Sequence, residues 1–117
     1  MATQPVILHV EDTPEQLQLV RVLLSPVCSL HQATTVSEAS QLIEKNIFDL
    51  VLLDMQLPDG SGQELIAQIR ARAASTRIVL HTASDNADIN AAVDGVISKT
   101  DTSVKDLRNR LLAMLEA

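Results

Sequence analysis

The chain has 117 residues, 46% of them apolar and 21% charged, which fits one globular domain and excludes a disordered chain. Its net charge of −6 disfavours direct binding to nucleic acid, whose phosphates proteins neutralise with basic side chains, and it disfavours attraction to anionic lipid. One cysteine excludes an internal disulfide, and without a signal peptide or a run of about 20 apolar residues we expect a cytoplasmic protein with no membrane insertion.

Short apolar runs alternate with amphipathic stretches along the whole chain. The runs are rich in Val, Ile and Leu, which suits strands that are buried on both faces of a sheet. Between them, apolar residues recur at helical spacing, and Thr35 or Ser37 is suited to cap the second helix. In chain order we predict strand 6–10, helix 17–24, strand 27–33, helix 36–43, strand 49–53, helix 65–69, strand 77–82, a short helix within 86–93, strand 95–98 and helix 104–115.

This order of elements predicts one α/β domain over residues 1–117. Strict alternation of strands and helices implies a parallel sheet with helices on both faces, which is a doubly wound fold. Right-handed crossovers leave few topologies, and the commonest five-stranded solution has the strand order 2-1-3-4-5. In such a sheet the functional site lies at the carboxyl ends of the strands, near the switch point between the first and third.

Three acidic residues stand at the carboxyl ends of strands that are neighbours in this order. Glu11 and Asp12 follow the first predicted strand, and Asp54 follows the third. Three anions brought together repel one another, and a hard divalent cation relieves that repulsion. Because oxygen ligands favour Mg²⁺, with Mn²⁺ as an alternative, we predict that these side chains hold such an ion.

Thr82 and Lys99 stand at the ends of the fourth and fifth predicted strands. A lysine, a hydroxyl group and a metal ion suit the negative charge that spreads over three oxygens during phosphoryl transfer. An aspartate can accept the phosphoryl group as an acyl phosphate, and Asp54 is the predicted acceptor. We expect this chain to catalyse only its own phosphorylation and dephosphorylation, at Asp54, and do not expect an enzyme acting on other substrates.

At these positions the chain resembles the receiver domains of two-component response regulators. The resemblance implies a flavodoxin-like fold of the chemotaxis-regulator type, with a histidine kinase or histidine phosphotransfer protein as phosphoryl donor and a further protein downstream. It also implies that the main-chain carbonyl of Gln56 is another metal ligand and that Thr82 and Lys99 contact the phosphoryl group. The matching residues are Val10-Glu11-Asp12, Leu52-Leu53-Asp54-Met55-Gln56-Leu57-Pro58-Asp59-Gly60-Ser61-Gly62, Thr82-Ala83 and Ser98-Lys99.

The chain departs from the family pattern in three respects. The acidic pair is Glu-Asp where Asp-Asp is commonest, and Lys99 is followed by Thr100 where a proline is usual. The stretch from Thr82 to Lys99 is short, which predicts a stunted fourth helix, and it leaves Val96 where an aromatic switch residue is usual. We therefore expect the response to phosphorylation to concentrate in loops beside the site, with an output surface around residues 83–94.

Other functions compete with this interpretation. A pseudo-receiver, which keeps the fold as an interaction module without the chemistry, is favoured by the short segment and disfavoured by the complete residue set. An aspartyl-phosphate phosphatase needs a second Asp two residues after the nucleophile, where this chain has Gln56. A nucleotide-binding domain needs a G-x-G-x-x-G motif or a P-loop, and neither occurs. We expect the domain either to stand alone or to be part of a larger regulator.

Three histidines and the cysteine receive structural predictions. His9, His31 and His81 fall in predicted strands and share no ligand spacing, so we expect them to pack rather than to bind metal. Cys28 is expected to pack as a small apolar residue.

Overall fold

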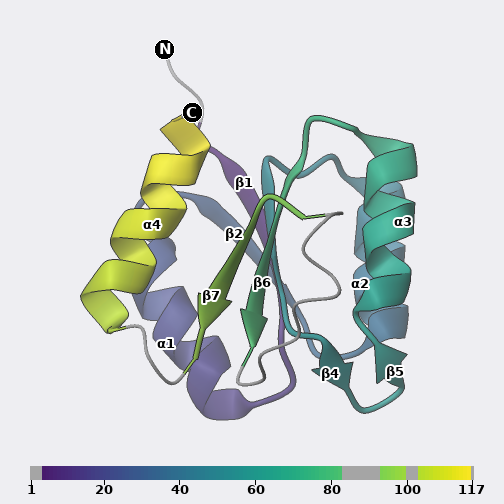
Figure 1. Ribbon diagram of the computed structural model, residues 1–117, viewed down its shortest axis with the longest axis horizontal. Helices are drawn as coiled ribbons and strands as arrows, with labels where there is room; N and C mark the ends of the chain where they lie inside the picture. Colours follow the sequence, from purple (N-terminus) through teal and green to yellow (C-terminus); the bar gives the residue numbers. More distant parts are fainter. Residues whose placement is uncertain (1–3, 83–92, 100–102, 117) are drawn as a thin grey trace.

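The computed structural model describes residues 4–82, 93–99 and 103–116 (Figure 1). Its main sheet has five parallel strands in the order β2-β1-β3-β6-β7, so the predicted order 2-1-3-4-5 is confirmed. Among the described residues, no helix combines the length and the apolar character needed to cross a membrane. The strands are β1 (Val6–Val10), β2 (Ser29–Ala33), β3 (Leu50–Leu53), β6 (Arg77–Thr82) and β7 (Gly95–Ser98).

Helices cover both faces of the sheet. Helices α1 (Pro14–Leu24) and α4 (Val104–Glu116) lie on one face, and α2 (Val36–Lys45) and α3 (Gln63–Arg72) lie on the other (Figure 1). Each face packs its own core, built mainly from aliphatic side chains, and Phe48 lies in the core on the α2 and α3 face. The core on the α1 and α4 face contains Ile7, Val20, Leu24, Cys28, Leu50, Leu52, Val79, Ile97, Leu107 and Leu111.

The predicted strands and helices that fall within the described residues are present, but several boundaries differ: α1 begins at Pro14, and α3 spans Gln63–Arg72, so both are longer than predicted. Strand β2 starts two residues later than expected, because the amides of Val27 and Cys28 both donate to the carbonyl of Leu24 and close the end of α1. The loop after β3 contains a small antiparallel hairpin, β4 (Gln56–Leu57) and β5 (Gly60–Ser61), which the sequence did not predict. Most of the predicted fourth helix and output surface, residues 83–92, lies outside the described residues.

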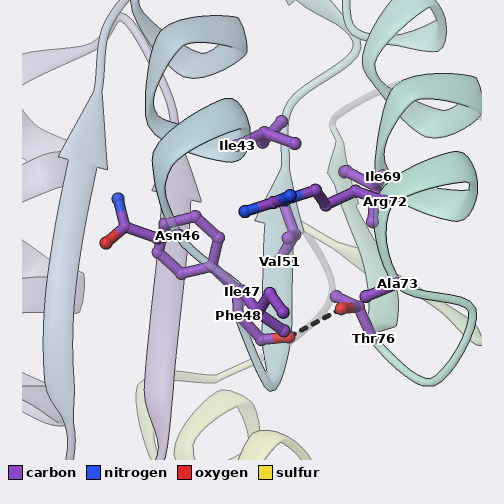
Figure 2. Close-up of a pocket in the computed structure, with 9 residues that line it drawn as sticks. All are labelled: Ile43, Asn46, Ile47, Phe48, Val51, Ile69, Arg72, Ala73 and Thr76. Carbon is purple, nitrogen blue, oxygen red and sulfur yellow. Dashed lines mark hydrogen bonds between the residues drawn. The ribbon is translucent and has the colours of Figure 1, made fainter.

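A pocket lies between the carboxyl ends of α2 and α3, at the amino end of β3 (Figure 2). Its volume is about 10 Å³, which is about the space that one water molecule needs. Thr76 donates a 2.6 Å hydrogen bond to the carbonyl of Phe48 at its floor. The pocket is a small packing space, at the opposite end of the sheet from the carboxylates.

Arg70 and Asp94 fix the start of β7 against β6 and α3. The Asp94 carboxylate accepts hydrogen bonds from the amide of Ile78 at 2.7 Å and from the Arg70 guanidinium at 2.9 Å. The same guanidinium donates to the carbonyl of Thr76 at 2.6 Å. Although partial burial by itself would raise the pKa of Asp94, these hydrogen bonds and the nearby guanidinium charges outweigh it and lower that pKa.

We expect Arg70→Ala to lower the free energy of unfolding by about 1–2 kcal/mol, because it removes charge-assisted hydrogen bonds to several partners. Urea unfolding followed by circular dichroism measures the loss. Arg108→Ala is the control, since Arg108 is exposed on α4, and it should change stability by less than about 0.5 kcal/mol. Equal stabilities of the two variants would contradict the role assigned to Arg70.

Candidate functional site

The predicted site residues project from one face at the carboxyl end of the sheet. His9 pairs in register with Leu52, and His81 pairs with Ile97. Alternate residues of a strand share a face, so Glu11, Asp54 and Lys99 lie on the α1 and α4 face. The backbone continues the ladder at the two acidic positions, where Glu11 N donates to Ala33 O and Asp54 N donates to Val10 O.

Lys99 lies between the two buried carboxylates. Its Nζ atom is 2.6 Å from Glu11 Oε1 and 3.2 Å from Asp54 Oδ2. Glu11 is fully buried and Asp54 is 7% exposed. The remaining carboxylate oxygens accept backbone hydrogen bonds, Glu11 Oε2 from Thr13 N and Asp54 Oδ1 from Gln56 N, both at 3.2 Å. The structure therefore brings together Glu11, Asp54 and Lys99 as the sequence predicted, with the lysine as a bridge between the two anions.

Burial and charge act in opposite directions on the ionisable groups here. Burial alone would lower the pKa of Lys99, but the hydrogen bond and charge of Glu11, with those of Asp54, outweigh it and raise that pKa. Burial raises the pKa of Asp54, and the negative charge of Glu11 raises it further; the Gln56 amide and Lys99 only partly oppose them. A second cation beside these carboxylates would favour ionised Asp54.

The acidic residues have the chemistry of a hard-cation site. Oxygens of Glu11, Asp12 and Asp54 lie within 4.8 Å of one another, and Asp12 is exposed. An all-oxygen set of this kind fits Mg²⁺. Gln56 begins β4 directly beside this cluster, and its amide already contacts Asp54. Thr82 is the last residue of β6 and pairs with Ser98, but its side chain lies outside the described part of the chain.

Gly62 allows the loop after β3 to pack under Asp54. A Cβ atom on Gly62 would lie 2.5 Å from the Asp54 carbonyl oxygen and 3.0 Å from a Leu53 methyl carbon. Its backbone has ordinary helical angles, so glycine is needed for close approach and not for conformation. The motif that carries the family resemblance thus has a steric reason that the sequence alone did not reveal.

Asp59 ties the same loop to the start of α2, a contact that sequence reasoning missed. Its carboxylate accepts hydrogen bonds from Val36 N at 2.7 Å and Ser37 N at 3.0 Å, while Thr35 caps the same helix by accepting from Glu38 N. Its partners Val36 and Ser37 lie more than 20 residues away in the chain, so spacing along the sequence did not indicate the contact. Acidic residues are favourable at helix amino ends, which is the one signal that points to this contact.

We expect this contact to weaken in acid. The backbone hydrogen bonds from Val36 and Ser37 lower the pKa of Asp59. When the pKa of a carboxylate is lower in the folded state than in the unfolded state, its ionised form stabilises the fold. This stabilisation is complete at pH values above the pKa of the unfolded state, and it is lost as the pH falls through the pKa of the folded state. Amide NMR shifts of Val36 and Ser37 should therefore titrate with a midpoint below about pH 3.9, the ordinary aspartate value.

The Asp59→Ala variant is the control for this titration, because it removes the carboxylate and should remove the transition at both amides. A midpoint at or above the ordinary aspartate pKa, or an unchanged transition in Asp59→Ala, would contradict the assignment.

His9 and His81 are buried, as expected of side chains that pack, and they also lie beside the carboxylates. They are 1% and 4% exposed, and donor atoms of His9, Glu11 and His81 lie within 4.8 Å of one another. Their spacing in the chain gave no signal, because β1 and β6 are distant in sequence. The expectation is confirmed for His31, whose ring packs edge-on against Phe48 with centroids 5.6 Å apart.

Cys28 also packs as predicted. It is buried in the core between α1 and the sheet, and burial raises the pKa of its thiol.

Comparisons with known proteins agree on one family. Residues 7–112 match the model of the response regulator receiver domain. The chain is 37% identical over 82 residues to the response regulator protein PilR of Pseudomonas aeruginosa, which covers 69% of this chain and 18% of that protein. It is 30% identical over 115 residues to the transcriptional regulatory protein BasR of Escherichia coli, covering 93% of this chain and 51% of that protein. The chain therefore spans from under a fifth to about half of these relatives.

Solved structures show the same fold. A CheY-like receiver domain protein from Methanospirillum hungatei superposes with a TM-score of 0.86 at 25% identity, covering 97% of this chain and 95% of that one. The response regulator protein TrrA from Thermotoga maritima was solved in complex with Mg²⁺ and a beryllium fluoride. It superposes with a TM-score of 0.83 at 26% identity, covering 95% of this chain and 99% of that one.

Proposed function

Because this chain belongs to the family of response regulator receiver domains, we propose that it accepts a phosphoryl group on Asp54 in two-component signalling. The donor is a histidine kinase or a histidine phosphotransfer protein, and the product switches an interaction with a downstream protein. The observation that carries the proposal is the position of Asp54, with one oxygen 3.2 Å from Lys99 Nζ and the other held by the Gln56 amide. We propose that this chemistry takes place in the cytoplasm.

The residues around Asp54 have different roles in phosphoryl transfer. The Asp54 carboxylate attacks phosphorus while the bond from phosphorus to the imidazole nitrogen of the donor histidine breaks and the donor leaves with its free imidazole. Lys99 offers its ammonium group to the phosphoryl oxygens as negative charge develops there. Glu11 and Asp12, with Asp54 and the Gln56 carbonyl, are the proposed metal ligands. Mg²⁺ bound there supplies the remaining positive charge that phosphoryl transfer needs. From the family resemblance, we propose that the Thr82 hydroxyl contacts a phosphoryl oxygen.

Labelling with acetyl phosphate tests the proposal. Intact-mass spectrometry should show one added phosphoryl group in the presence of Mg²⁺. When EDTA is added to chelate the ion before labelling, no adduct should form. The pseudo-receiver alternative predicts no adduct under any of these conditions, so the same experiment separates the two functions.

Metal binding gives a second prediction. We expect Mg²⁺ to raise the melting temperature of the wild-type chain, because an ion that binds only the folded state stabilises it by mass action. At a concentration 100 times the dissociation constant the gain is about 2.7 kcal/mol. The rise should be much smaller in Asp12→Ala. In the control Glu44→Ala, which removes an exposed acidic residue of α2, it should equal that of the wild type. Equal rises in all three proteins would remove Asp12 from the ligand set.

A further inference from the structure

We propose that His9, Glu11 and His81 form a second metal site, specific for a borderline divalent ion such as Zn²⁺, and that its occupation blocks phosphorylation of Asp54. The donor atoms of the three residues lie within 4.8 Å of one another, and all three side chains are buried. The set shares only Glu11 with the proposed Mg²⁺ ligands. The blocking step rests on the proposed function, whereas the binding step does not.

The two imidazoles present ring nitrogens that lack partners. Within the described part of the chain, neither His9 Nε2 nor His81 Nδ1 has a hydrogen-bond partner, although both atoms are buried. Buried polar atoms normally have a hydrogen-bond partner, so two unpaired ring nitrogens beside one carboxylate are unusual. A metal ion bound between them would satisfy both.

The donor set selects the kind of metal. Two imidazoles and a carboxylate suit Zn²⁺ and related ions, whereas Mg²⁺ prefers oxygen alone. Donor atoms on a tetrahedral zinc ion lie about 3.4 Å apart, given bonds of about 2.1 Å. The three residues would have to close by at most about 1.4 Å, which is a side-chain rotation and not a change of fold.

Lys99 and Gln32 would have to respond to such an ion. Lys99 Nζ lies 2.6 Å from Glu11 Oε1, so a cation bound to that oxygen repels it. Gln32 Nε2 lies 3.2 Å from His9 Nδ1, while the Gln32 amide is also held by Leu17 O and Arg21. Coordination through His9 Nε2 places the ring proton on Nδ1, and Gln32 must then turn its oxygen toward it.

The consequence for Asp54 follows from these displacements. An ion on Glu11 competes with Mg²⁺ for a shared ligand. It also drives Lys99 away from the place where the ammonium group would meet the phosphoryl oxygens. Zn²⁺ should therefore inhibit labelling by acetyl phosphate even in excess Mg²⁺.

The test titrates the full chain with Co²⁺, whose visible absorption reports imidazole coordination, and then displaces it with Zn²⁺. We expect one site per chain, with binding at least tenfold weaker in His9→Leu and in His81→Val. Asp12→Ala, which removes a proposed Mg²⁺ ligand, and His31→Gln, which removes the histidine outside the cluster, should bind Co²⁺ as the wild type does. Far-ultraviolet circular dichroism checks that each variant is folded.

Two further measurements complete the test. Gln32→Glu should tighten Co²⁺ binding by about tenfold, because a carboxylate accepts the Nδ1 proton better than an amide. The Zn²⁺ concentration that halves acetyl phosphate labelling should rise at least tenfold in His81→Val relative to the wild type.

The outcomes separate this inference from the proposed function. Wild-type Co²⁺ affinity and spectrum in folded His9→Leu and His81→Val would overturn the site, and so would weaker binding in Gln32→Glu. Inhibition by Zn²⁺ that is unchanged in His81→Val would overturn the blocking step. Failure of Mg²⁺-dependent labelling without any Zn²⁺ would instead refute the proposed function and leave the metal-binding result standing.

Discussion

Asp54→Ala is expected to abolish labelling of this chain by acetyl phosphate. Among the carboxylates of the described residues, Asp54 is the one whose oxygen atoms contact Lys99 and the Gln56 amide while also lying in the Glu11 and Asp12 cluster. Alanine removes the nucleophile itself, so no remaining group takes its place. Intact-mass spectrometry after incubation with Mg²⁺ measures the result.

The control for this experiment is Asp106→Ala. Asp106 is exposed in the first turn of α4, so its removal should leave the yield of the adduct unchanged. A full-yield adduct on the Asp54→Ala protein would mean that another residue is the acceptor, and peptide mapping would then identify it.

Gly62→Ala should have the largest effect on stability of the substitutions considered. The added methyl group would lie 2.5 Å from the Asp54 carbonyl oxygen and about 3 Å from Leu53, so backbone and buried side chain must both move. Inserting an atom into packed structure of this kind costs about 1–3 kcal/mol. The same shift displaces Asp54 from Lys99, so labelling by acetyl phosphate should also slow.

Gly95→Ala provides the matched control. A Cβ atom on Gly95 would meet only the flexible end of Met114, at 3.1 Å, and that side chain can move aside. Thermal unfolding should show a loss in Gly62→Ala and a change of less than about 0.5 kcal/mol in Gly95→Ala. Similar melting temperatures for the two variants would show that the loop under Asp54 yields to the extra atom.

The strand order and the edge of the sheet that carries the site could be predicted from the amino-acid sequence alone. Five apolar runs alternated with amphipathic stretches, and acidic or basic residues followed them at Glu11, Asp54 and Lys99. This was enough because the alternation of strands and helices leaves few topologies, and in a parallel sheet all carboxyl ends meet at one edge. Adjacency of these residues therefore follows from chain order without any knowledge of side-chain contacts.

Which of these groups are in contact could be read only from the folded structure. Lys99 bridges Glu11 and Asp54, Asp59 holds the start of α2, and His9 lies beside the cluster with His81. Each contact joins elements that are distant in the chain, and it depends on strand register, on the path of a loop and on which face a side chain shares. Spacing along the sequence encodes none of these distances, since they are set when the strands pair and the two aliphatic cores close around them.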